Sequence, residues 1–337
     1  MSKQAEILST HTAGLFQGAV RRAAELLRAG EVVALPTETV YGLASNALDP
    51  RAVARIYEIK GRPARNPIIV HVASLEMARF CAREWPERAD RLAGAFWPGP
   101  LTMVLPRSAG IPDAVTAGGE TVGIRWPSHP FIQAVIRECG FPLAAPSANL
   151  SNQVSATNAE HVWKTLGHRI RLIVDGGQAQ VGIESTVLDL SIDPPRLLRP
   201  GMIHVESLLA VTGGLQTSGA EEPHLKSPGL LRKHYSPKAR LIVWSWQDEG
   251  ELSQKLAAAG CAAETVAVIA HSCIPLAGRF GSVRVIPHDP EAFARALYAE
   301  LHRCDEAGAR CIVVEELPDG PEWLAIEDRL RRAAAED

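Results

Sequence analysis

The chain has 337 residues, 46 % of them apolar, and a formal net charge of −3. This apolar share supplies enough side-chain volume for more than one core and excludes an intrinsically disordered chain. The small excess of acidic residues excludes a protein that coats nucleic acid through surplus Lys and Arg, so any basic site must be local.

Membrane and secreted proteins are also disfavoured. No run approaches the ~18 apolar residues that a membrane span needs, and the first residues lack the basic and apolar stretches of a signal peptide. We therefore expect a cytoplasmic protein without a membrane partner. The six cysteines are scattered, with no CxxC pair and no dense framework, which indicates reduced thiols.

The first two thirds of the chain alternate helical and strand patterns, which is typical of one sheet flanked by helices. The predicted helices cover residues 16–29, 50–60 and 130–139. The predicted strands cover residues 32–35, 68–72, 101–105, 121–126, 142–145, 172–175, 185–190 and 197–199. Thr157 and Glu160 have the spacing of a capping box, which predicts another helix beginning at that point.

The last third differs in composition and pattern. Residues 212–238 are rich in Gly, Ser, Pro, Glu and Lys and are predicted to form a linker between a first domain, 1–211, and a second, 239–337. The second domain is predicted to be a small, Rossmann-like, three-layer α/β unit, but it lacks the GxGxxG fingerprint of dinucleotide binding. Its predicted strands are 241–244, 265–270 and 310–314, and its predicted helices are 251–259, 290–302 and 322–334.

Polar side chains follow the first buried strand of the predicted sheet. Thr37, Glu38 and Thr39 stand where the strand 32–35 ends, the usual place for a ligand site in an α/β sheet. Taken alone, the same residues are also compatible with an ordinary polar turn.

The segment after the second helix concentrates cations. Lys60, Arg62 and Arg65 fall within six positions, in what we expect to be an exposed loop fixed by Gly and Pro. A guanidinium and an ammonium together suit a polyphosphate, although a solvated charged loop is the plain alternative. Arg125 and Arg199 close two other strands, and a cationic pocket able to hold ATP results if these strand ends converge.

Two further strand ends offer small hydroxyl and amide groups. Ser147 and Asn149 follow the strand 142–145, and Ser185 begins the strand 185–190. Such groups orient carboxylate or phosphate oxygens, but each segment taken alone favours the plainer interpretation of a cap or a turn. We find no P-loop, no His or Cys spacing typical of a metal site, and no Gly-x-Ser-x-Gly elbow for a covalent nucleophile.

Taken together, these segments resemble the threonylcarbamoyl-AMP synthases of the Sua5/YrdC family, in the longer Sua5-type form with an extra C-terminal domain. The resemblance covers residues 31–238 and rests on eight segments that occur in the family's order. They are PTETVYGL, KGRPARNPIIVH, FWPGPLT, VGIRWPSHP, APSANLS, IESTVLDL, LLRPG and SPGLLRKHYSPKA.

The resemblance implies a twisted, mixed-sheet YrdC-like domain with a concave, positively charged cavity. It also implies a reaction in which L-threonine and bicarbonate or CO2 form a carbamate, whose oxygen attacks the α-phosphorus of ATP and expels pyrophosphate. The product, threonylcarbamoyl-AMP, serves N6-threonylcarbamoyladenosine formation at position 37 of tRNA. Mg²⁺ would enter with the ATP phosphates, without a metal site built by the protein.

The family's site residues carry over position by position. Residues 227–237 match a segment that folds over the cavity as a lid, and Asn152 stands where we expect glycine. The positions matching the catalytic motifs are Lys60, Arg62, Ser147 and Asn149. The positions implied to bind ATP are Lys60, Arg62, Asn66, Thr121, Ser147, Ser155, Arg199, His234 and Tyr235. The positions implied to bind threonine are Thr39, His71, Arg125, Ala145 and Ser185.

The implied partner is the transferase complex that passes the threonylcarbamoyl group to tRNA, with weak or transient RNA contact in addition. An RNA-binding module is the alternative from another class, but the sequence lacks an aromatic strand motif such as that of an RRM. A carbamoyl-transfer module of hydrogenase maturation is a third interpretation. The acylphosphatase-like and zinc-finger regions of that system are not visible in this chain.

Overall fold

The computed structural model of the protein describes residues 4–217, 226–229, 233–276 and 278–335. The chain divides into two compact units: residues 1–151 with 155–230, and residues 152–154 with 231–337. Parts of the predicted linker, 218–225 and 230–232, lie outside the described residues. Within the described ranges, no helix has the length and apolar character to cross a membrane.

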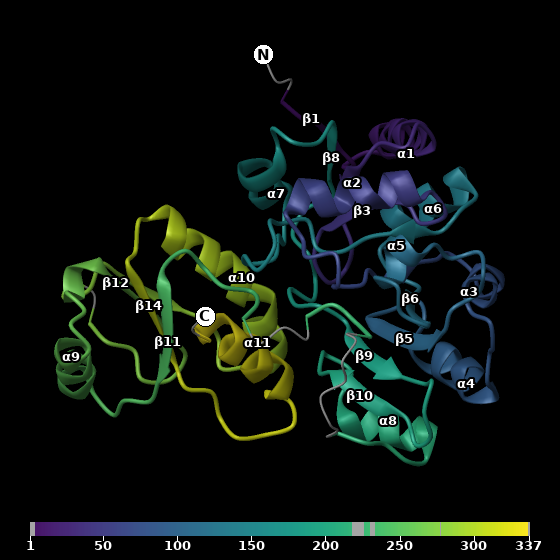
Figure 1. Ribbon diagram of the computed structural model, residues 1–337. Helices are drawn as coiled ribbons and strands as arrows, with labels where there is room; N and C mark the ends of the chain where they lie inside the picture. The colour runs from purple at the N-terminus through teal and green to yellow at the C-terminus, as the bar shows by residue number, and fades with distance from the viewer. Residues whose placement is uncertain (1–3, 218–225, 230–232, 277, 336–337) are drawn as a thin grey trace. The chain divides into compact units, whose positions relative to one another are not determined.

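The first unit is built on a ten-stranded mixed sheet with the order β1-β8-β2-β3-β7-β4-β6-β5-β9-β10 (Figure 1). Its strands are β1 (Glu6–Ser9), β2 (Val33–Leu35), β3 (Gly42–Asn46), β4 (Val70–His71), β5 (Leu101–Pro106), β6 (Thr121–Arg125), β7 (Leu143–Ala144), β8 (Leu172–Asp175), β9 (Thr186–Asp189) and β10 (Arg196–Arg199). Its helices are α1 (Ala13–Arg28), α2 (Pro50–Lys60), α3 (Leu75–Cys81), α4 (Glu87–Phe96), α5 (Asp113–Thr116), α6 (Pro130–Cys139), α7 (Ala159–Leu166) and α8 (Val205–Thr212).

Helices cover both faces of this sheet. This is shown by alternate residues of one strand, which are buried in different hydrophobic clusters. Val33 and Leu35 pack with α1 and α6, where Phe16 and Phe131 meet edge-on with ring centroids 5.2 Å apart. Ala34 belongs to the cluster that α2, α4 and α7 cover on the other face. A sheet buried on both sides has polar groups only at its strand ends, which is where ligands can reach it.

The end of α2 shows how the sequence sets up the candidate site. The Asp49 carboxylate accepts a hydrogen bond from the Arg51 amide at the N-terminus, and Pro50 occupies the first turn. Gly61 ends the helix in the left-handed conformation, with φ 60°. The helix therefore stops where predicted, and the chain turns sharply at Lys60 and Arg62.

Several short elements escaped prediction. Strand β3, with the sequence GLASN, is poor in residues that favour strands, yet it pairs with both β2 and β7. Helix α8 lies across the predicted domain limit at 211–212. A helix does follow Thr157, but its N-cap is Asn158, whose side chain accepts from the His161 amide, so the predicted capping box is wrong by one residue.

The second unit has a four-stranded, fully parallel sheet with the order β11-β14-β12-β13. One face packs on α9 through Trp246, Leu252 and Val268, and α10 and α11 lie on the other face (Figure 1). The predicted three-layer α/β arrangement is confirmed. The elements are β11 (Arg240–Trp244), α9 (Glu249–Ala258), a 3₁₀ turn η1 (Ala263–Thr265), β12 (Val266–Ala270), β13 (Ser282–Val285), α10 (Pro290–Glu306), β14 (Cys311–Glu315) and α11 (Leu324–Ala334).

Candidate active site

The turn after β2 is buried and internally bonded. The Thr37 hydroxyl donates to the Val40 carbonyl at 2.6 Å and accepts from the Thr39 amide at 3.2 Å. These bonds hold the turn in one conformation and fix the direction of Glu38 and Thr39, which are both buried. The segment is therefore not the solvated turn that the sequence left open.

Glu38 and Arg125 form a buried ion pair between the β2 turn and the end of β6. Arg125 Nη2 lies 2.6 Å from Glu38 Oε1, and Nη1 donates to the Thr39 hydroxyl at 2.8 Å. Burial raises the pKa of Glu38, but the Arg125 charge together with hydrogen bonding from Arg125 and from backbone amides brings the net pKa below its usual value, so the pair is charged. Among the described residues, Arg125 Nε has no hydrogen-bond acceptor, which leaves one donor available to a ligand.

His71 lies beside Arg125 in the sheet. It ends β4, which runs parallel to β6 with His71 opposite Arg125, and it is only 3 % exposed. Neither of its ring nitrogens has a hydrogen-bond partner within the described part of the chain. Burial, followed by the Arg125 charge, holds the pKa of His71 well below its usual range, so the imidazole is neutral. Buried, unpaired nitrogens are costly and indicate a group built to meet a ligand.

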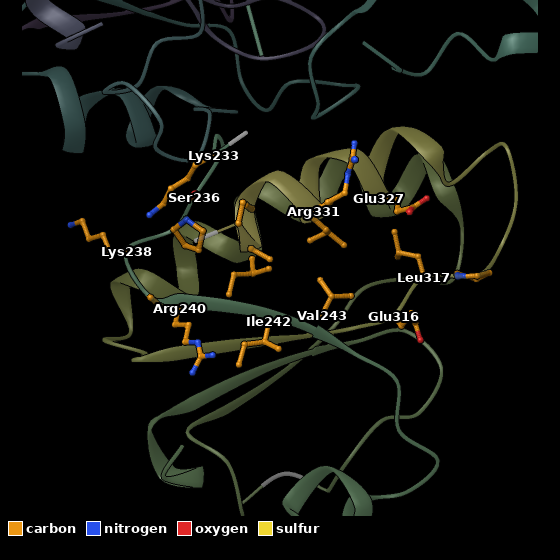
Figure 2. A pocket seen from close by; sticks show the side chains of 18 of the residues that line it. Lys233, Ser236, Lys238, Arg240, Ile242, Val243, Glu316, Leu317, Glu327 and Arg331 are labelled. Carbon is orange, nitrogen blue, oxygen red and sulfur yellow. The ribbon is translucent and has the colours of Figure 1, made fainter. Parts of the chain in front are cut away.

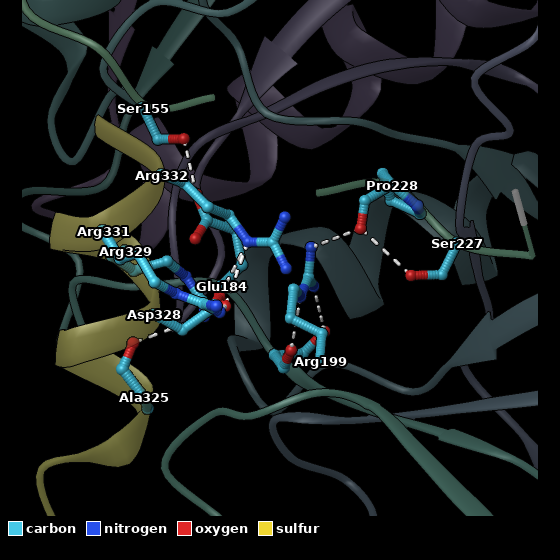
Figure 3. A network of polar contacts seen from close by, with 11 residues as sticks. Ser155, Glu184, Arg199, Ser227, Pro228, Ala325, Asp328, Arg329, Arg331 and Arg332 are labelled. Carbon is cyan, nitrogen blue, oxygen red and sulfur yellow. Dashed lines mark hydrogen bonds and ion pairs between the residues drawn. The ribbon is translucent and has the colours of Figure 1, made fainter. Parts of the chain in front are cut away.

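Ser185 and Arg199 are joined at the start of β9 and the end of β10. Arg199 Nε donates to the Ser185 carbonyl at 3.0 Å, and Nη2 donates to its hydroxyl at 3.1 Å. The same hydroxyl lies 2.8 Å from that of Thr102. Arg199 Nη1 reaches the Pro228 carbonyl at 3.0 Å, so this arginine also holds the first residues of the predicted lid (Figure 3).

Lys60 is not in an exposed loop, as the sequence suggested, but is 2 % exposed. Its ammonium donates to the carbonyls of Ser147 and Asn149, both at 2.5 Å. Burial, and then the nearby Arg62 charge, holds the pKa of Lys60 well below its usual value. The structure therefore joins two segments that the sequence singled out separately.

Arg62 also differs from the prediction of an exposed loop, because it is 8 % exposed. The chain folds back after Gly61, so that Nε donates to the Asn66 carbonyl at 3.0 Å and Nη2 to the Asn66 side-chain oxygen at 2.7 Å. The Asn66 amide nitrogen, also buried, has no acceptor within the described residues. Arg65, by contrast, is exposed.

The remaining predicted residues lie in different places. Ser155 donates to Glu184 at 2.6 Å, and the Ala145 amide donates to the Ile69 carbonyl at 3.1 Å, both in the first unit. Thr121 begins β6 and so lies about 13 Å from Arg125, at the other end of the strand. His234 and Tyr235 belong to the second unit and are described with it below.

Thr102 and Glu184 were not singled out from the sequence, and Glu38 was named there only with the polar turn, not among the residues implied to bind a substrate. Each stands inside one of the eight recognised segments, PTETVYGL, FWPGPLT and IESTVLDL. The signal was therefore present, but only the fold shows that each of them contacts a predicted site residue.

A separate cavity of about 900 Å³ lies within the second unit, between β11, the chain after β14, and α11 (Figure 2). None of the predicted site residues lines it. Its charged lining residues are of both signs, so it has no marked preference for anions or cations. They are Lys233, Lys238, Arg240, Arg331, Glu316, Asp319 and Glu327.

The fold and the strand-end residues define an α/β protein with a buried site of cations, hydroxyls and a neutral imidazole, suited to small anionic substrates. Comparison with known families agrees with this class. The Sua5/YciO/YrdC family, described as "Telomere recombination", matches residues 25–201. The family described as "Threonylcarbamoyl-AMP synthase, C-terminal domain" matches residues 203–335.

Individual relatives extend over nearly the whole chain. The threonylcarbamoyl-AMP synthase of Pyrococcus abyssi is 40 % identical over 94 % of this chain and 94 % of its own. That of Bacillus subtilis is 43 % identical over 94 % of this chain and 92 % of its own. The crystal structure of P. abyssi Sua5 complexed with L-threonine superposes with a TM-score of 0.89, at 38 % identity, covering 98 % of both chains.

This protein belongs to the threonylcarbamoyl-AMP synthase family, in its Sua5-type form with both domains. The predicted family, fold class and enzyme function are confirmed.

Proposed function

We propose that the residues at the strand ends of the first unit bind L-threonine and ATP and convert them, with bicarbonate or CO2, to threonylcarbamoyl-AMP and pyrophosphate. The observation that carries the assignment is the buried Arg125, paired with Glu38 and adjacent to the neutral, unpartnered His71. This arrangement offers a donor to one carboxylate while keeping a buried charge compensated.

Threonine is proposed to bind at Thr39, His71, Arg125, Ala145 and Ser185. Arg125 Nε would meet the substrate carboxylate, and the hydroxyl of Thr39 is already oriented by Arg125 Nη1. The P. abyssi relative, 38 % identical, has been crystallised with L-threonine, which supports an amino-acid subsite in this fold. Because His71 is neutral, one of its ring nitrogens can accept a hydrogen bond from a substrate ammonium or hydroxyl.

ATP is proposed to bind on the Lys60 side of the site. Lys60 and Arg62 supply positive charge, and the Asn66 amide supplies a donor that no described residue uses. The full proposed set is Lys60, Arg62, Asn66, Thr121, Ser147, Ser155, Arg199, His234 and Tyr235. Three residues of this set, Lys60, Arg62 and Ser147, would act in catalysis together with Asn149.

The proposed reaction requires positioning more than covalent participation by the protein. A carbamate oxygen attacks the α-phosphorus while pyrophosphate leaves, so the residues must hold the two reactants in line and balance phosphate charge. In the described ranges, no three His, Cys, Asp or Glu side chains gather as a metal site. Mg²⁺ is proposed to enter with the ATP phosphates, where it would supply further charge neutralisation.

We also propose that the chain is divided as its sequence predicts. Residues 1–211 would form the catalytic domain, 212–238 a linker whose part 227–237 acts as a lid, and 239–337 the C-terminal domain. The bond from Arg199 to the Pro228 carbonyl supports the lid, because it ties that segment to a residue proposed to bind nucleotide. We also propose that the enzyme works in the cytoplasm and supplies a tRNA threonylcarbamoyl transferase complex.

Pyrophosphate release tests the proposal. The purified chain is incubated with ATP, Mg²⁺ and bicarbonate, with L-threonine, with L-serine, or with no amino acid. Release that depends on L-threonine is the expected result. Release without an amino acid would contradict the proposed function. Absence of release together with tight RNA binding would instead identify the basic site as one that binds RNA.

A further inference from the structure

Residues 152–154 are a covalent link between the two units. They group with the second unit, although residues 151 and 155 on either side belong to the first. The Ser236 amide donates to the Asn152 carbonyl at 2.8 Å, and Gln153 and Ser236 form a parallel bridge. Asn152 has φ 65°, which confirms the left-handed backbone expected at this position.

Residues proposed to act in the active site flank this link directly along the chain. The Ser151 amide donates to the Lys60 carbonyl at 2.9 Å, and the Ser155 hydroxyl donates to Glu184 at 2.6 Å. Displacement of residues 152–154 would therefore be transmitted through covalent bonds to Asn149 and Ser155.

Tyr235, next to Ser236, is held by both helices on one face of the second unit. Its ring stacks on that of Tyr298 in α10, with centroids 5.9 Å apart and an angle of 28°. The guanidinium of Arg329 in α11 lies 5.4 Å from the centre of the same ring. Tyr235 itself has φ 62°, a left-handed conformation that costs free energy for a bulky residue and persists only when neighbours enforce it.

Arg329 is held in its turn by an acidic neighbour. The side chain is completely buried, and Nη1 lies 3.0 Å from Asp328 Oδ2. Asp328 also pairs with Arg331 and Arg332 (Figure 3). The backbone carbonyl of Arg332 accepts from the His234 amide at 3.2 Å. Burial of an arginine carries a large desolvation cost, so the contact of the Arg329 guanidinium with the Tyr235 ring requires an explanation.

We propose that Arg329 is a positioning residue for the nucleotide side of the active site. Held by Asp328, it fixes Tyr235; Ser236 follows and, through its bond to Asn152, sets residues 152–155. The C-terminal unit thereby acts on catalysis by ordering Ser155 and Asn149. The inference rests on the proposed function, because these residues matter to turnover only if they bind ATP.

Arg329→Met and Arg331→Met make a matched pair of variants. Both remove one arginine from the same helix and from the same aspartate, but the Arg331 side chain is 70 % exposed. Hydrogen exchange of residues 152–155 and 233–237 is measured by mass spectrometry, together with the KM values for ATP and threonine. In Arg329→Met, we expect hydrogen exchange in both segments to rise. The KM for ATP should increase about tenfold or more, because the nucleotide loses part of its binding contacts.

The matched and conservative variants complete the expected pattern. The KM for threonine stays within about twofold, since threonine is proposed to bind at Arg125, and Arg331→Met resembles the wild type. Arg329→Lys, which keeps a cation over the ring, recovers at least part of both effects. Exchange of β12 and β14 stays slow in every variant that retains the fold.

Specific results would overturn the inference. One is loosening of 233–237 with unchanged exchange of 152–155; another is an equal effect of Arg331→Met. If Arg329→Met does not fold, Tyr298→Leu removes the opposite ring contact and gives the same readout. A wild type that releases no pyrophosphate would refute the proposed function, whereas the exchange experiment would still decide the coupling.

Discussion

Buried polar groups at the strand ends of the two units differ in whether they have hydrogen-bond partners. In the second unit, the Glu315 carboxylate at the end of β14 accepts three backbone amides, from His271, Ser272 and Cys273, at 2.7 to 2.9 Å. In the first unit, both ring nitrogens of His71 and Nε of Arg125 lack partners among the described residues. A fully satisfied group stabilises the fold, whereas an unsatisfied one carries a cost that a ligand can repay.

The largest expected effect comes from Lys60→Met. We expect threonine-dependent pyrophosphate release to fall by about 100-fold or more, the scale for loss of an oriented charge in an active site. The carbonyls of Ser147 and Asn149 also lose their donor, so the free energy of unfolding should drop by about 1–3 kcal/mol. Turnover assays and urea unfolding measure the two effects, with the surface Lys164→Met as control.

Arg125→Lys should affect the threonine subsite selectively. An ammonium cannot reproduce the fork that meets Glu38, Thr39 and a substrate carboxylate together, so the KM for threonine should rise about 10- to 100-fold. The KM for ATP should change much less. Steady-state kinetics with each substrate varied in turn would show this, and an equal rise in both KM values would contradict the separate subsites.

Glu315→Gln tests the group whose hydrogen bonds are all made, the Glu315 carboxylate of the second unit. Loss of the carboxylate removes the charge that all three amides face and leaves at least one of them without an acceptor, so the second unit should lose about 1–3 kcal/mol of stability. Denaturant unfolding measures this loss. At temperatures where the unit stays folded, pyrophosphate release should match the wild type, and a large drop in turnover would show that Glu315 has a role beyond structure.

The smallest effect is a pH dependence from His71. Its pKa is well below the ordinary value of 6.5 in the folded state, so below pH 6.5 the unfolded chain binds more protons and stability falls as pH falls. His71→Gln should remove a slope that approaches about 1.4 kcal/mol per pH unit about one pH unit below that value. Unfolding curves between pH 5 and 7.5 would reveal it, and identical slopes for both proteins would mean that folding does not shift the pKa of His71.

Much of the fold was predictable because its signals are local. The second helix is an example: Asp49 and Pro50 begin it and Gly61 ends it, all within the segment itself. Strand β3 was missed because Gly, Ala, Ser and Asn favour no strand alone, and only pairing with β2 and β7 makes them one. The capping error at Thr157 has a local cause, because either of two adjacent side chains, Thr157 or Asn158, could cap the helix.

The sequence by itself determined the family, the α/β class and the identity of the polar segments, because residue order and short motifs carry that information. Only the tertiary structure decided that Lys60 and Arg62 are buried. The acceptors of Lys60 lie 87 and 89 residues further along the chain, and no local pattern encodes a bond of that span. The pairing of Arg125 with Glu38 was likewise fixed by the tertiary arrangement of β2 and β6.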